Sequence, residues 1–72
     1  MMKAMSHREL VTILRAKGCE MIRQKGSHQW WKCGSCNAVV PRHRDIAPGT
    51  LRQIVRLLEP CLGENWLEGT LQ

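Results

Sequence analysis

The sequence lacks long apolar runs, internal repeats and low-complexity tracts. No apolar stretch approaches the ~20 residues that a membrane-spanning helix requires, and the N-terminal residues lack the apolar core of a signal peptide. These absences argue against a membrane partner, and we expect a cytoplasmic protein. With 72 residues, the chain has little room to enclose a cofactor in its thin core. We therefore expect one small domain without a cofactor.

Acidic residues are also scarce. Six Asp and Glu stand against eleven Lys and Arg, which gives a net charge of +5. A basic excess of this kind favours binding to polyanions, chiefly a nucleic acid or an acidic protein. It predicts the class of partner and says nothing about the fold.

The four cysteines lack a second metal-binding motif. Cys33 and Cys36 form one Cys-x-x-Cys pair, but a tetrahedral zinc site needs four Cys or His ligands. Disulfide scaffolds are typical of secreted chains, so we expect Cys19, Cys33, Cys36 and Cys61 to be reduced thiols that hold no metal. The interpretation that we favour places Cys33 and Cys36 on either side of a Gly-Ser hairpin turn. A zinc site completed by scattered residues is the alternative.

Two helices are predicted, one near each end of the domain. Ser6 and Glu9 have the spacing of a capping box, and Gly18 is placed to end the first helix in a left-handed conformation. The second helix is predicted to begin at Pro48 and to end at Pro60. Apolar residues follow helical spacing in both: Leu10, Ile13 and Leu14 in the first, and Leu51, Ile54, Val55 and Leu58 in the second.

Three strands are predicted between the helices, over residues 19–25, 28–32 and 37–40. In the first strand Met21, Arg23 and Lys25 are expected on one side. Trp30 and Trp31 should point to opposite faces of the second strand, one into the core and the other available to stack on a base or to fill a partner's pocket. The order predicts an α+β fold of the form α-β-β-β-α, with both helices on one face of a three-stranded antiparallel sheet.

The domain is predicted to span residues 1–60. Residues 61–72 lack a strong period and form a C-terminal tail that either packs on the domain or is loose. Trp66 and Leu67 are the residues that would pack.

The segment 23–28 carries the clearest chemical signal. His28 directly follows Gly26 and Ser27, and the cations Arg23 and Lys25 precede them. An imidazole exchanges protons near neutral pH, and RNA cleavage needs proton transfers together with stabilisation of charge on phosphate. We expect His28 to be the catalytic acid or base. Arg23, Lys25 and the backbone N–H of Gly26 or Ser27 are candidate phosphate contacts.

A second basic segment surrounds His43. Arg42 and Arg44 flank this histidine, and we expect all three to contact RNA phosphates from an exposed loop. His43 and Lys25 are also the candidates for the second proton transfer. His7, in the first turn of the first helix, is expected to be simply exposed.

Three segments together resemble the HicA family of bacterial toxins. They are Lys25-Gly26-Ser27-His28, then Val40-Pro41-Arg42-His43, then Ile46-Ala47-Pro48-Gly49-Thr50-Leu51-Arg52-Gln53-Ile54, in register from about residue 6 to residue 58. The resemblance implies a fold like that of double-stranded-RNA-binding domains, a type II toxin that cleaves mRNA, and His28 as its catalytic residue. It also implies a HicB antitoxin that blocks the active surface. The Cys33–Cys36 turn and residues 59–72 depart from the family pattern.

Two other functions fit the same residues. The chain can be a non-catalytic RNA-binding module of this fold, or a small zinc-binding interaction domain built on Cys33 and Cys36. An alanine at His28 separates the first from the toxin, because a pure binder keeps its effect. Metal analysis of the purified protein tests the second.

Overall fold

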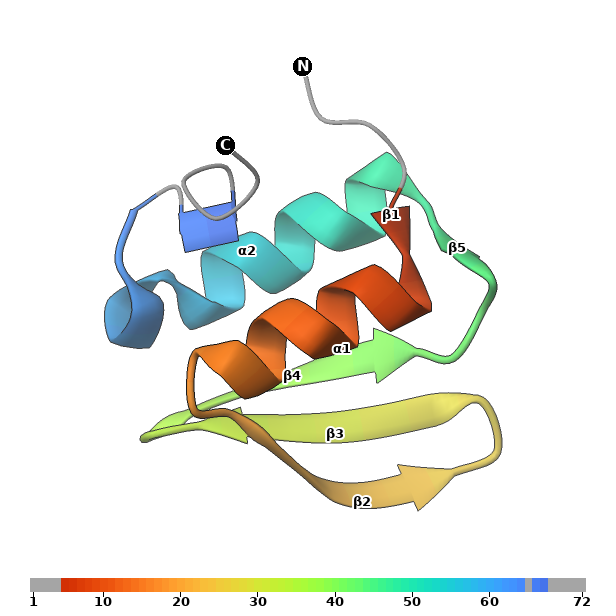
Figure 1. Ribbon diagram of the computed structural model, residues 1–72, viewed down its shortest axis with the longest axis horizontal. Helices are drawn as coiled ribbons and strands as arrows, with labels where there is room; N and C mark the ends of the chain where they lie inside the picture. Colours follow the sequence, from red (N-terminus) through yellow and green to blue (C-terminus); the bar gives the residue numbers. More distant parts are fainter. Residues whose placement is uncertain (1–4, 65, 68–72) are drawn as a thin grey trace.

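Two helices cover one side of a three-stranded antiparallel sheet in the computed structural model, which describes residues 5–64, 66 and 67 (Figure 1). The sheet has the order β2-β3-β4, and a second sheet pairs β1 with β5. The predicted α-β-β-β-α order and α+β class are confirmed. In chain order the elements are β1 (Met5–Ser6), α1 (His7–Ala16), β2 (Glu20–Lys25), β3 (His28–Cys33), β4 (Cys36–Pro41), β5 (Asp45–Ile46) and α2 (Pro48–Leu62).

The core lies between the helices and the sheet. On β3, Gln29, Trp31 and Cys33 are buried, whereas the alternating His28 and Lys32 are exposed, as expected for a sheet covered on one face. No helix among the described residues is long and apolar enough to cross a membrane. The buried apolar residues are Met5, Leu10, Val11, Ile13, Leu14, Cys19, Trp31, Cys33, Ala38, Val40, Ile46, Leu51, Ile54, Val55, Leu58, Trp66 and Leu67.

The caps of α1 form as predicted. The hydroxyl of Ser6 accepts a hydrogen bond from the backbone N–H of Glu9 at 3.1 Å. At the other end Gly18 has φ 85°. The N–H groups of Gly18 and Cys19 donate to the carbonyls of Arg15 and Leu14 at 3.0 and 2.9 Å, which is the Schellman arrangement. These two caps fix where the chain enters and leaves the helix.

Two predictions about the elements are wrong. Helix α2 continues through Pro60 to Leu62, because a proline near the end of a helix removes only one of its last hydrogen bonds. In β2 the register shifts between Met21 and Arg23. This bulge places these two side chains on opposite faces of the sheet, where the sequence pattern had put them on one.

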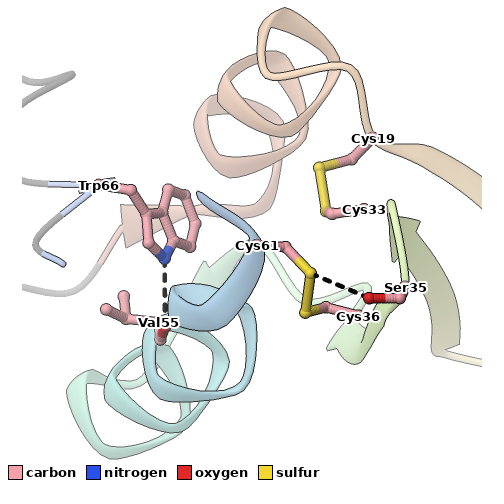
Figure 2. Close-up of a disulfide and its surroundings, with 7 residues drawn as sticks. All are labelled: Cys19, Cys33, Ser35, Cys36, Val55, Cys61 and Trp66. Atoms are coloured by element: carbon pink, nitrogen blue, oxygen red, sulfur yellow. Dashed lines mark hydrogen bonds between the residues drawn. A yellow bond between two sulfur atoms is a disulfide. The ribbon is translucent and has the colours of Figure 1, made fainter. Parts of the chain in front are cut away.

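The expectation of reduced thiols is also wrong. Cys19 is bonded to Cys33, and Cys36 is bonded to Cys61, which joins the end of α2 to the β3–β4 hairpin (Figure 2). Cys33 and Cys36 do flank the hairpin turn and pair with each other across it. Their partners come from distant segments that only the folded chain brings near, with Cα–Cα distances of 4.3 and 6.1 Å.

The zinc alternative would need the thiolates of Cys33 and Cys36 together. Each sulfur is instead bonded to a different cysteine. Within residues 5–64, 66 and 67, no group of three or more His, Cys, Asp or Glu side chains is placed to hold a metal ion.

Trp66 and Leu67 lie in the segment predicted as a tail, and both are buried. The indole N–H of Trp66 donates to the backbone carbonyl of Val55 at 3.1 Å (Figure 2). These two residues therefore complete the core against α2. The rest of the segment from residue 68 lies outside the described residues.

Candidate active site

A tight turn presents His28 at the end of the sheet. Lys25 of β2 pairs with His28 of β3, so Gly26 and Ser27 alone connect the two strands. Gly26 has φ 59°, a left-handed conformation that glycine adopts without steric cost. The carbonyl of Ser27 accepts a hydrogen bond from the backbone N–H of Arg42. This bond ties the turn to the segment that follows β4.

His28 and His43 line the same pocket. The pocket has a volume of about 340 Å³, and Asp45 and Thr50 also line it. His28 comes from β3, whereas His43 comes from the connection between β4 and β5. His28, His43 and Asp45 therefore border one space, whereas the sequence alone did not show whether His43 lies near His28. Such a set can take a proton from one atom of a substrate and give a proton to another.

The N-terminus of α2 borders this pocket through Ala47 and Thr50. Ala47 is the N-cap residue of α2 and makes no side-chain capping bond. The backbone N–H of Leu51 donates to the carbonyl of Ala47 at 2.9 Å, which is the first hydrogen bond of this helix among the described residues. The preceding N–H groups of Gly49 and Thr50 are therefore not used within the helix. Uncapped N–H groups and the helix dipole favour a negatively charged group at this position.

Cations and an aromatic ring occupy the face of the sheet that the helices leave uncovered. Arg23 pairs with Trp30 across β2 and β3, and its guanidinium carbon lies 5.2 Å from the centre of the Trp30 ring. The rings of His28 and Trp30 are 6.4 Å apart, centre to centre. Lys25 shares this face as the partner of His28, because directly paired residues project to the same side. The two tryptophans take opposite faces, as predicted: Trp31 is buried and Trp30 is half-buried.

Arg42, His43 and Arg44 line a second hollow, with His7 and Arg8 of α1 on its other side. The structure thus brings His43 beside both His28 and α1. His7 and Arg8 were not among the predicted site residues, because they lie more than 30 positions from Arg42 in the sequence. The excess of basic residues over acidic ones was the only sequence feature that pointed to a role for His7 and Arg8 in the site.

His7 is half-buried and hydrogen-bonded, so the prediction of a simply exposed residue is wrong. Its Nε2 lies 2.7 Å from the side-chain oxygen of Gln29. Gln29 donates in turn to the side-chain oxygen of Gln24 at 3.1 Å, and Gln24 donates to the carbonyl of Gly26 at 3.4 Å. A chain of side-chain hydrogen bonds therefore runs from α1 to the turn that precedes His28.

Residues 7–59 match a family model described as "HicA toxin of bacterial toxin-antitoxin". The match covers most of the chain and defines it as the toxin of a bacterial toxin–antitoxin system, which acts together with an antitoxin partner. The chain belongs to the HicA toxin family. Comparisons with curated proteins and with solved structures give no match.

Proposed function

We propose that this toxin is an endoribonuclease that cleaves mRNA without a metal ion and so stops translation and growth. The observation that carries the proposal is the pocket shared by His28 and His43. One imidazole takes the proton from a ribose 2′-OH, whose oxygen attacks the adjacent phosphorus. The bond from phosphorus to the 5′-oxygen breaks, and the other imidazole protonates that oxygen. The products are a 2′,3′-cyclic phosphate and a free 5′-OH.

Positive groups around the pocket support the phosphate part of the reaction. Lys25 and Arg23 lie on the same face of the sheet as His28. The first turn of α2, whose N–H groups have no partner within the helix, borders the pocket through Ala47 and Thr50. Preorganised donors of this kind stabilise the charge that develops on phosphate in the transition state. Arg42 and Arg44 extend the basic surface beyond His43. Gly26 and Ser27 act through the turn that positions His28.

The experiment compares the protein with its His28→Ala variant on an RNA substrate in the presence of EDTA. Loss of one acid–base group is expected to slow cleavage by about 10²–10⁴-fold. Arg56→Ala is the matched control, because Arg56 is an exposed residue of α2 that lines none of the pockets described here. Circular dichroism verifies that both variants fold. Cleavage by His28→Ala at the original rate would refute the proposed role of His28. Absence of RNA cleavage by the unaltered protein, together with growth arrest that His28→Ala retains, would favour the alternative of a non-catalytic RNA-binding module.

We further propose that the antitoxin is of the HicB type and inhibits by covering His28. The uncovered face of the sheet combines the cations Arg23 and Lys25 with the exposed apolar side chain of Val39. An acidic and apolar segment complements such a face, and opposite charge speeds the encounter. Co-expression with the neighbouring small open reading frame should restore growth, and Lys25→Glu should weaken the complex. Growth arrest that persists on co-expression would contradict this assignment.

Because mRNA is the substrate, the proposed site of action is the cytoplasm.

A further inference from the structure

Three hollows adjoin one another around the start of α1. The His28 pocket shares His43 with the hollow that contains Arg42 and Arg44. This second hollow shares His7, Arg8 and Arg42 with a third, which Arg15 also lines. We call the set His7, Arg8, Arg15, Arg42 and Arg44 the α1 track. It leads from the candidate active site across α1.

Four of the five residues of the α1 track are arginines. The second and third hollows have volumes of about 420 and 410 Å³, and none of the described residues that line them is acidic. The only carboxylate in the three hollows is that of Asp45, beside the two histidines. The track therefore attracts a polyanion, whereas the carboxylate of Asp45 lies beside the two histidines that are proposed to transfer protons.

Two side chains of the track are held in place before any ligand binds. The ring of His7 is fixed by its hydrogen bond to the buried Gln29. The guanidinium of Arg15 lies over the ring of buried Trp31, with its carbon 5.6 Å from the ring centre. Side chains that are already ordered lose less conformational entropy on binding. This separates the track from an ordinary solvated basic surface.

We propose that the α1 track is a second RNA-binding subsite, which holds consecutive backbone phosphates of a single strand on one side of the cleaved bond. This inference rests on the proposed ribonuclease function. Arg8 and Arg15 contact phosphates directly, and Arg42 lies between them and the reacting nucleotide. These contacts are made to the RNA backbone, so the track contributes to affinity and does not distinguish between bases.

The test measures binding of a fluorescein-labelled, 2′-O-methylated RNA, which lacks the attacking hydroxyl, by anisotropy at several salt concentrations. Arg8→Gln and Arg15→Gln are each expected to weaken binding about threefold to tenfold and to lower the slope of log K against log salt by about 0.7. Arg56→Gln is the control and should leave the slope unchanged. On cleavable RNA the two track variants should raise KM and keep kcat.

An unchanged slope in Arg8→Gln and Arg15→Gln, or an equal change in Arg56→Gln, overturns the inference. Normal RNA binding with weakened antitoxin binding also overturns it, and assigns the track to the protein partner. Arg8→Gln gives a readout independent of the Trp31 contact, so a folding defect in Arg15→Gln does not decide the result. The binding assay needs no catalysis, so it tests the track separately from the proposed ribonuclease function. Unchanged RNA binding in the track variants would refute the track alone, whereas RNA cleavage that does not depend on His28 would refute the proposed function alone.

Discussion

The side-chain oxygen of Gln29 accepts hydrogen bonds from two rings, the imidazole of His7 at 2.7 Å and the indole of Trp31 at 3.2 Å. The indole nitrogen is only a donor, so the atom that it contacts is the amide oxygen of Gln29. The Nε2 of His7 therefore carries a proton in this arrangement. One buried amide thus fixes the tautomer of His7, holds the core tryptophan and, through Gln24, reaches the turn before His28.

Replacing Gln29 by Met should destabilise the fold. The change keeps much of the volume but leaves the buried N–H of Trp31 without its acceptor, at a cost of about 1–3 kcal/mol in the free energy of unfolding. Urea denaturation measures the loss. Gln53→Met, at an exposed position of α2, is the control and should change stability by less than about 0.5 kcal/mol. Equal stability of the two variants would contradict the role of this amide.

Gly26 and Gly49 should respond in opposite directions to alanine. A Cβ would meet no atom within 4 Å at either position, so only the backbone differs. Gly26 has φ 59°, and a left-handed conformation costs a non-glycine residue roughly 1–2 kcal/mol. Gly49 lies in the first turn of α2, where alanine should stabilise by about 0.4–1 kcal/mol. Thermal denaturation of the two variants tests the difference, and a stabilised Gly26→Ala would be inconsistent with this turn.

Opening the Cys36–Cys61 disulfide should lower stability without unfolding the sheet. The bond closes a loop with a sequence separation of 25, for which constraint of the unfolded chain contributes about 2–4 kcal/mol. The Cys36→Ser/Cys61→Ser double variant should show this loss in urea denaturation. Adding a reductant should then lower the free energy of unfolding of the double variant further, because Cys19–Cys33 is the one disulfide that it retains. Titration of thiols in the unreduced protein provides the control, and four reactive thiols would show that neither disulfide forms.

Trp66 should matter more for stability than Trp30. Trp66 is buried and donates to the carbonyl of Val55. In Trp66→Phe the loss of this bond and of ring volume should cost about 1–3 kcal/mol. Trp30→Phe keeps an aromatic ring at a half-buried position and should change the free energy of unfolding by about 0.5 kcal/mol or less. A larger effect at Trp30 would contradict this view of the core.

His43 should affect catalysis nearly as strongly as His28. It lines the same pocket, so His43→Ala should lower kcat by about 10²–10⁴-fold if it is the second proton-transfer group. Binding of 2′-O-methylated RNA should fall much less. A kcat within twofold of the original, with weaker RNA binding, would show that His43 only contacts phosphate. Asp45 would then be the next residue to test as the partner of His28.

The sequence by itself determined the elements whose signals are local. Ser6 and Glu9 cap α1, Gly18 ends it, and the Gly26-Ser27 turn separates β2 from β3, because each of these features depends on residues a few positions apart. The same local reasoning failed at Pro60, where helical hydrogen bonds on either side outweigh the loss of one. It failed again around Ile22, because β2 pairs with β3 through a bulge at this position. The alternation of side chains along the sequence does not predict that bulge.

Tertiary structure alone decided which distant side chains meet. The sheet register and the return of the chain after β4 place His43 beside His28, and the packing of α1 on the sheet places His7 against Gln29. The length of α2 brings Cys61 to Cys36. None of these pairs has a sequence spacing that predicts contact, because each distance depends on the relative position of two packed elements. His28 could be named from the sequence as the central residue of the candidate site, while its neighbours in the pocket are a property of the fold.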